Sequence, residues 1–231
     1  MNKILPLFVF IFSFHLASSQ EDTVVKESDS LYKEDQFYIG VTYNLLGNKP
    51  NGVSQSGFSS GFHLGFIKDM PINIRRNVAI GLGLGVSANS FNQNMLIDKA
   101  DGQFVYSVLD ENEISYSKNK FTTYVIEAPL EFRWRTSTAS EYKFWRIYTG
   151  IKFGYVVANS SKYKGEPQKI KHSNIDEFNA FQYGLTISVG YNTWNLHLYY
   201  GLNPVFNSDA KINDERLQMN AIKIGLMLYL L

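Results

Sequence analysis

The residues of this sequence that could carry chemistry are two histidines, two neighbouring glutamates and a glycine-rich run. Some lipid-modifying enzymes pair a histidine with a serine, but the spacing places no serine or acid beside His63 or His197. Glu127 and Glu131 lie about 13 Å apart on an extended strand, too far for a glycosidase pair. The glycines of residues 81–85 lack the following helix that a phosphate-binding loop requires. We therefore expect no catalytic residue, no cofactor site and no metal site.

The composition excludes several function classes. The chain has 231 residues, no cysteine and a formal net charge of +1, so disulfides and thiolate metal sites are impossible. A nucleic-acid-binding protein would carry a concentrated basic charge, which a near-neutral chain does not suggest. Aromatic residues make up 15% of the chain and are available for a protein surface in contact with lipid.

Side chains alternate between apolar and small or polar along most of the chain. Ile80, Leu82 and Leu84, for example, alternate with Gly81, Gly83 and Gly85, which is the period of a β-strand. Similar segments recur at residues 36–46, 57–67, 77–90, 123–135, 144–157, 179–192, 194–203 and 222–230. No comparably long helical pattern follows residue 20, so the sequence predicts an all-β fold.

Two architectures fit this alternation. A secreted sandwich would bury the apolar faces, whereas a transmembrane barrel would turn them toward lipid and enclose the charges. The segments number about eight, an even count, and their length suits tilted membrane strands. The connections between them alternate between long and short. Aromatic residues stand at strand ends, as in Phe37, Trp134, Trp145, Tyr191 and Trp194. These features favour a transmembrane, antiparallel, up-and-down β-barrel.

The amino-terminal residues predict export. Lys3, an apolar run and the small residues Ala17, Ser18 and Ser19 follow the order of a cleaved signal peptide at residues 1–19. The alternative, a membrane anchor, would need a longer apolar run. Residues 20–35 are acidic and polar, and predict a flexible periplasmic segment before a barrel domain at 36–231. We expect both termini in the periplasm and the barrel in the outer membrane of a Gram-negative bacterium.

Charged residues on the inward faces predict an ion network in the lumen. Opposite charges in a narrow barrel offset each other's lost hydration, and about eight strands enclose just enough space for side chains. With a turn centred near Ala139 and Ser140, Glu127 would lie opposite Lys152, and Glu131 diagonal to Arg146. We therefore expect a plugged barrel. The predicted network comprises Glu127, Glu131, Arg133, Arg146, Lys152 and Lys223.

A wall of glycines is predicted on the inward face of one strand. Gly81, Gly83 and Gly85 weaken a strand, so their small size should make room for long residues from other strands. The candidates for that space are Arg133, Arg146, Tyr148 and Tyr199.

The long connection near residue 165 carries four lysines: Lys162, Lys164, Lys169 and Lys171. A solvated loop is one interpretation of this charge. The other is contact with anionic lipopolysaccharide or with a partner outside the cell.

Residues 126–155, IEAPLEFRWRTSTASEYKFWRIYTGIKFGY, resemble the PorT (SprT) family of outer-membrane barrels, as do residues 35–73 and the KIGLMLYL ending. The resemblance implies a Bacteroidetes cell envelope and a non-enzymatic component needed for type IX protein secretion, surface delivery of exported proteins and gliding. Other type IX secretion components would be its partners. The alternative is a stand-alone barrel that is porin-like, adhesive or envelope-stabilising.

Overall fold

The computed structural model describes residues 34–110, 114–136, 144–165 and 168–230. The predicted signal peptide at 1–19 and nearly all of the predicted periplasmic segment at 20–35 lie outside these ranges. Within them, no helix is long and apolar enough to cross a membrane. The eight long strands are β1 (Gln36–Gly47), β2 (Ser60–Pro71), β3 (Val78–Asn92), β6 (Tyr116–Arg135), β7 (Trp145–Gly165), β9 (Phe181–Tyr191), β10 (Trp194–Pro204) and β13 (Asn220–Leu230).

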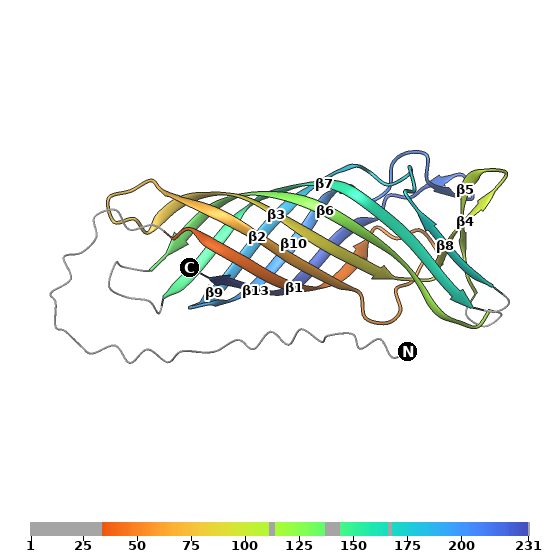
Figure 1. Ribbon diagram of the computed structural model, residues 1–231, viewed down its shortest axis with the longest axis horizontal. Coiled ribbons are helices and arrows are strands. Elements are labelled where there is room, and N and C mark those ends of the chain that lie inside the picture. Colours follow the sequence, from red (N-terminus) through yellow and green to blue (C-terminus); the bar gives the residue numbers. More distant parts are fainter. Residues whose placement is uncertain (1–33, 111–113, 137–143, 166–167, 231) are drawn as a thin grey trace, which may run out of the picture.

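These strands close into an antiparallel barrel (Figure 1). Each long strand pairs with the next one along the chain, and β1 pairs with β13 to complete the ring. Closure removes every free sheet edge from the barrel wall. The predicted all-β, up-and-down barrel of eight strands is confirmed, and the sandwich alternative is wrong.

The two ends of the barrel differ in their connections. At one end, which we call the turn end, short connections join β2 to β3, β6 to β7 and β9 to β10. The last of these spans only residues 192–193, where Asn192 takes a left-handed φ of 56° that asparagine tolerates. The four longer connections meet at the opposite end, the loop end, on the right in Figure 1. β1 begins and β13 finishes at the turn end.

The outer wall of the barrel is apolar, whereas a soluble protein turns mainly polar side chains outward. Outward residues of β3 such as Leu82 and Leu84 are 54% and 66% exposed, while their neighbours face the lumen. On β6 the outward apolar face runs from Tyr124 to Trp134, which at the usual rise and tilt spans about 25 Å, the height of a barrel's lipid-facing band.

Aromatic side chains mark both margins of this band. Near the turn end lie Phe37, Trp134, Trp145, Tyr191 and Trp194, all exposed. Toward the loop end lie Tyr43, Tyr124, Tyr155, Phe181, Tyr183 and Tyr200, also exposed. Two aromatic belts of this kind sit where the barrel wall passes from lipid to headgroups.

The long connections contain structure that the alternation did not predict. β4 (Met95–Ala100) and β5 (Gln103–Val108) form a hairpin, as do β11 (Lys211–Ile212) and β12 (Glu215–Arg216). β6 and β7 run well past the band, and β8 (Lys169–Ser173) adds to the edge of β7. The turn Asp101-Gly102 has two positive φ angles, which is the conformation that closes a two-residue hairpin.

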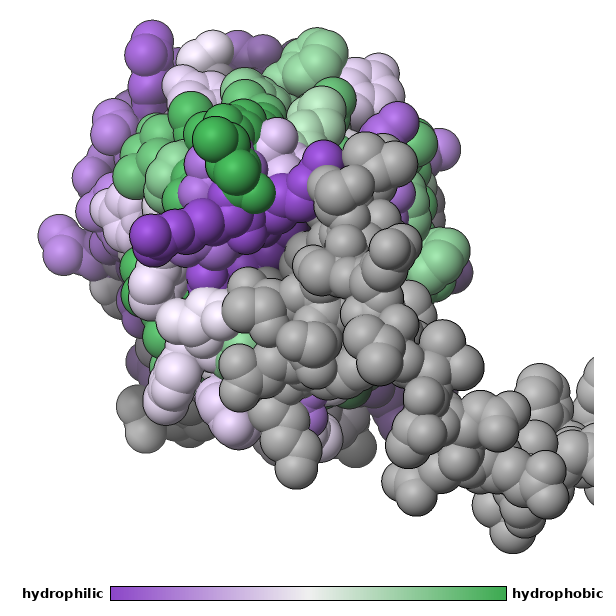
Figure 2. All heavy atoms as spheres, turned by 90° about the vertical axis from the view of Figure 1, so that its left-hand side faces the viewer, coloured by the Kyte–Doolittle hydropathy of each residue, from purple (hydrophilic) through white to green (hydrophobic). Residues whose placement is uncertain are grey.

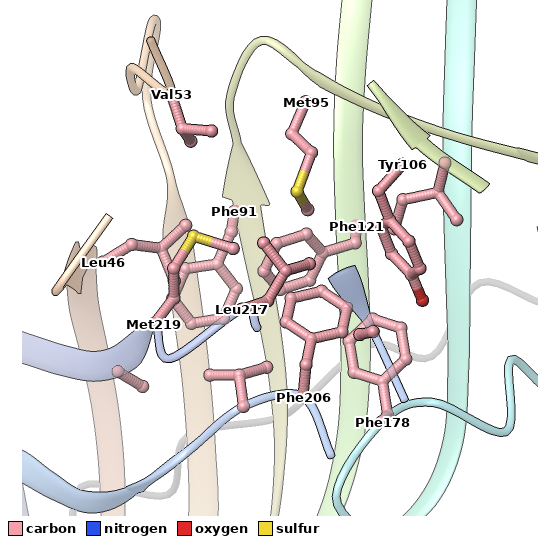
Figure 3. Close-up of a cluster of buried hydrophobic side chains, with 14 of the residues drawn as sticks. Leu46, Val53, Phe91, Met95, Tyr106, Phe121, Phe178, Phe206, Leu217 and Met219 are labelled. Atoms are coloured by element: carbon pink, nitrogen blue, oxygen red, sulfur yellow. The ribbon is translucent and has the colours of Figure 1, made fainter. Parts of the chain in front are cut away.

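The apolar core of the molecule lies at the loop end. Side chains from the long connections pack with inward residues of the strands, as Figure 3 shows around Phe121. Phe121 contacts the rings of Phe91, Phe178 and Phe206 at centroid distances of 4.9, 5.5 and 5.4 Å. We call this cluster the apolar plug. Its members are Leu46, Val53, Phe91, Met95, Ile97, Tyr106, Phe121, Ile175, Phe178, Tyr199, Val205, Phe206, Ala210, Ile212, Leu217, Met219 and Ala221.

Candidate functional site

The lumen near the turn end is filled by charged side chains centred on Asp69. Arg135 donates two hydrogen bonds to the Asp69 carboxylate, from Nη1 to Oδ1 and from Nη2 to Oδ2, both at 2.8 Å. Arg133 Nη1 donates a third, also 2.8 Å, to Oδ1. All three side chains are fully buried. Bidentate pairing of this kind is among the strongest polar contacts in proteins, so the carboxylate fixes both guanidinium groups.

The residues just before β1 complete this group. Glu34 Oε2 lies 3.8 Å from Arg135 Nη1 and 3.9 Å from Arg146 Nη2, and Asp35 accepts a 2.8 Å hydrogen bond from the backbone N–H of Asp69. The first described residues are therefore bound into the barrel mouth. We call Glu34, Asp69, Glu131, Arg133, Arg135 and Arg146 the turn-end ion cluster. Figure 2, which looks onto this end, shows a band of hydrophilic side chains across its middle and apolar side chains above that band.

Aromatic rings lie beneath the arginines. The Arg133 guanidinium sits 4.1 Å from the ring centroid of Tyr148, and Tyr148 packs edge-on against Tyr229 at 5.4 Å. A cation over an aromatic face gains electrostatic energy where water is excluded. The cluster is thus supported from the lumen side by a layer of tyrosines.

A second polar group, the mid-lumen cluster, lies between the turn-end ion cluster and the apolar plug. Lys152 Nζ lies 3.2 Å from Glu127 Oε2, and His63 Nδ1 lies 3.2 Å from Glu127 Oε1. On the other side of the ring, His63 Nε2 lies 3.2 Å from Thr42 Oγ1, which donates to Asn44 Oδ1 at 2.8 Å. The members of this cluster, Thr42, Asn44, His63, Glu127 and Lys152, are all buried, and each of them has a hydrogen-bonding or ionic partner within the cluster.

Thr42, His63 and Glu127 have the order of hydroxyl, imidazole and carboxylate found in nucleophilic catalysis. A nucleophile also needs space for a substrate beside its oxygen. Thr42 is 1% exposed, and the cavity that borders Glu127 and Lys152 has a volume of about 10 Å³, which has room for at most one water molecule and none for a substrate. The arrangement therefore acts as a buried hydrogen-bond chain that ties β1 to β2 and β6.

The second histidine has a partner of its own. Ser188 Oγ lies 2.7 Å from His197 Nδ1 and 3.4 Å from the Tyr229 hydroxyl. Lys223 stands 4.8 Å above the Tyr199 ring. These contacts join the neighbouring strands β9, β10 and β13 on their lumen faces.

The structure divides the six residues of the predicted lumen network between two places. Glu131 and Arg133 lie 3.5 Å apart at the turn end, where Arg146 also lies, whereas Glu127 and Lys152 pair at mid-lumen. Lys223 lies against Tyr199.

The predicted register between β6 and β7 is wrong by two residues. Glu127 pairs with Gly154 and Pro129 with Lys152, so the ion pair is diagonal. Glu131 lies opposite Gly150, and Arg146 lies opposite Arg135. The proposed turn centre, Ala139 and Ser140, falls outside the described residues. The register depends on the pairing of the whole strands, which no local sequence pattern specified.

The predicted glycine wall faces the lumen, and Arg133, one of the four residues predicted to fill its space, lies against it, whereas other side chains fill the space beside Gly83 and Gly85. A β-carbon at Gly81 would lie 2.7 Å from Cδ of Arg133, as expected, but one at Gly85 would lie 2.0 Å from the Tyr38 hydroxyl. At Gly83 it would meet the Phe66 carbonyl oxygen at 2.6 Å.

Side chains beyond the predicted ones also take up this space. The same β-carbon at Gly83 would lie 2.7 Å from Ile67 and 2.9 Å from Pro129. Tyr199 lies instead against Gly184, and Tyr148 lies under Arg133.

The sequence interpretation missed Asp69, Arg135 and Glu34 as members of the charged group. If the alternating pattern of residues 57–67 is continued by two residues, Asp69 falls on the inward face, as it does in β2. Arg135 lies on the predicted inward face of residues 123–135. No pattern marked Glu34, because it precedes the first strand. Among the described residues, no group of three or more histidine, aspartate or glutamate side chains could hold a metal ion.

A comparison with protein families agrees with this architecture. A model of the family described as "Outer membrane protein beta-barrel domain" matches residues 18–207, which include every barrel strand except β13. Among solved structures, the chain is similar to Ail, the attachment invasion locus protein of Yersinia pestis. The identity is 14% and the TM-score 0.36, over 86% of this chain and 99% of that one. A comparison with curated proteins gives no match.

Proposed function

Because the chain belongs to the outer-membrane protein β-barrel domain family, we propose that it acts in the outer membrane as a non-enzymatic component of type IX protein secretion. The filled lumen is the structural observation that carries the first part of this proposal, a barrel that is neither an enzyme nor an open channel. The apolar plug packs into the loop end, and the turn-end ion cluster packs into the other. A barrel filled in this way acts through its surfaces and through what it binds.

The secretion assignment rests on the resemblance of residues 126–155 to the PorT (SprT) family. This run supplies parts of β6 and β7 and contributes Glu131, Arg133, Arg135 and Arg146 to the turn-end ion cluster. The resembling residues therefore build the end of the barrel at which β1 begins. We place this end in the periplasm, with the signal peptide at 1–19 removed and the predicted flexible segment ending before Glu34 and Asp35, which are bound in the barrel mouth.

A deletion strain tests the assignment. In the species that encodes this chain, deleting its gene is expected to abolish surface delivery of type IX cargo, and restoring the wild-type gene is expected to recover it. Normal cargo secretion without the protein would show that the secretion role is wrong. Cargo should be measured in the medium and on the cell surface, with a periplasmic enzyme as the control for lysis.

The filled lumen has a separate test. Purified protein in a planar bilayer is expected to give no stable open-channel conductance, because both ends of the lumen hold packed side chains. A porin of known conductance, prepared in the same detergent, serves as the control. Steady single-channel steps would contradict a plugged barrel.

A second candidate function is a stand-alone barrel for adhesion or envelope stability. The observation in its favour is the folded surface at the loop end, where the hairpins β4–β5 and β11–β12 lie over the apolar plug. A deletion strain that secretes cargo normally but attaches poorly to surfaces, or becomes sensitive to detergent, would favour this function over secretion.

A further inference from the structure

Six lysines form a regular array on the part of the wall that projects beyond the loop-end aromatic belt. β6, β7 and β8 continue there as a three-stranded ribbon (Figure 1). The pairing register places the lysines directly opposite one another in two rows of three. One row is Lys120, Lys162 and Lys171, and the other is Lys118, Lys164 and Lys169. We call these six residues the lysine grid.

All six ammonium groups lie on one face of the ribbon. Side chains two residues apart on a strand, and side chains paired across strands, share a face. Lys120 is partly exposed and the other five are exposed, whereas Asn119, Ser161 and Tyr163 between them are buried. The grid faces away from the lumen, because Lys118 and Lys120 continue the outward face of β6 that includes Tyr124.

This arrangement is unfavourable for the isolated protein. Like charges directly opposite on neighbouring strands destabilise a sheet, and the β-carbons of such a pair lie about 5 Å apart, within the screening length of physiological salt. None of the ion pairs among the described residues includes a lysine of the grid. Lys120 donates a 3.1 Å hydrogen bond to Ser90, which leaves its charge unbalanced. An anion bound to the grid would relieve the repulsion.

The β4–β5 hairpin packs against the face of the ribbon opposite the lysines and holds the ribbon in place. His172 of β8 lies 3.2 Å from Asp98 of β4 and packs edge-on against Phe104 of β5 at 5.6 Å. The β4–β5 hairpin thus covers the inner face of the ribbon and leaves the lysine face open. Fixed positions reduce the entropy lost when a ligand binds.

The position of the grid identifies the ligand. Lys120 lies four residues beyond Tyr124, or about 10 Å above the aromatic belt for a strand tilted near 45°. The row of Lys118 lies one further step out. Headgroups extend about 5–8 Å beyond the hydrocarbon on each side, so the long side chains of the Lys120 row reach back into this layer and those of the Lys118 row lie at its outer edge. The nearest abundant anions at this depth are phosphates of the lipid that surrounds the barrel.

We propose that the lysine grid binds the phosphate groups of an anionic glycolipid, lipopolysaccharide, in the leaflet at the loop end. The acyl chains of that lipid would lie along the apolar wall below the grid, and its phosphates would bridge lysines of neighbouring strands. The proposal rests on the periplasmic placement of the turn end proposed above, which puts the loop end in the outer leaflet, and does not depend on a role in secretion.

The test compares lipid binding to the full-length protein and to a variant without the grid charge. The probe is diphosphoryl lipid A, added to protein in neutral detergent, with bound lipid counted by native mass spectrometry. Replacing all six lysines by glutamine is expected to weaken binding by about tenfold or more. The matched control, Lys68→Gln with Arg75→Gln, neutralises two exposed charges at the turn end and should change affinity by less than about twofold.

Two further arms separate the sources of phosphate and the role of the lysines. Dephosphorylated lipid A should bind the wild-type protein about as weakly as diphosphoryl lipid A binds the grid variant, and inorganic phosphate should not displace the lipid. The grid variant should unfold at the same temperature as the wild type or at a higher one, because repulsion has been removed.

Equal affinity of the wild type and the grid variant would overturn the proposal, as would a loss of binding that merely accompanies a lower unfolding temperature. Displacement by inorganic phosphate would show a site for the free ion. Strong binding of the grid to heparin with no binding of lipid A would show an acidic polysaccharide to be the ligand instead.

Discussion

Replacing Asp69 by asparagine is expected to destabilise the barrel strongly, because this carboxylate fixes two buried arginines. The change keeps the shape of the side chain and removes its charge. Arg133 and Arg135 together donate three hydrogen bonds of 2.8 Å to it. Hydrogen bonds to charged groups contribute about 1.5–3 kcal/mol each. Their sum overstates the loss, since Glu131 and Glu34 remain at 3.5 and 3.8 Å from the arginines.

The expected loss in the free energy of unfolding is therefore about 3–5 kcal/mol, the usual cost of removing one partner from a buried ion pair. Urea titration of the protein folded in phospholipid vesicles, followed by tryptophan fluorescence, measures it. Trp134 and Trp145 lie beside Arg133, Arg135 and Arg146 in sequence and report on this end.

A matched substitution provides the control. Asp98 also forms an ion pair, with His172 at 3.2 Å, but its side chain is 35% exposed. Asp98→Asn should cost less than about 1 kcal/mol. Adding Arg135→Met to Asp69→Asn should recover part of the loss, because one uncompensated buried charge is removed. If Asp69→Asn costs no more than Asp98→Asn, the reasoning about the turn-end ion cluster is refuted.

Three other changes test the packing of the lumen and the loop end. Gly83→Leu should impair barrel assembly, because even its β-carbon would lie 2.6 Å from a backbone oxygen, whereas Leu82→Ile on the lipid face should leave the folded yield unchanged; equal yields would contradict this. Phe121→Ala should lower the free energy of unfolding by about 3–5 kcal/mol, since the ring is fully buried in the apolar plug, and urea titration showing under about 1 kcal/mol would count against a packed plug. Burial and the Glu177 carboxylate raise the pKa of Tyr106 above its usual value, so the folded state keeps a proton that the unfolded state loses. Stability should fall above pH 10, by up to about 1.4 kcal/mol per pH unit from this group. Tyr106→Phe should make that fall shallower, and identical pH profiles would oppose the assignment.

The sequence was most informative where a local period decides the structure. Alternation with a period of two predicted the eight strands and which residues of each face lipid, because a strand turns successive side chains to opposite faces. The order of long and short connections gave the barrel topology. The Asp101-Gly102 dipeptide of the β4–β5 hairpin is also a turn signal in the sequence.

The pairing within the lumen could not be predicted in the same way. Glu127 and Lys152 were predicted to lie opposite each other, but they meet diagonally because the register between β6 and β7 depends on the whole strand. Arg133 and Arg146 were assigned to one network with Glu127, although the two arginines lie in the turn-end ion cluster and Glu127 pairs with Lys152 at mid-lumen.

The sequence by itself determined the fold class, the lipid-facing surface and the residues that face inward, since each depends on neighbours along one strand. Only the tertiary structure decided which inward residues meet. Asp69 joins Arg133 and Arg135 across 64 and 66 residues, and the six lysines come together from three strands. Closure of the barrel sets these contacts, because strand tilt and stagger depend on all eight strands at once.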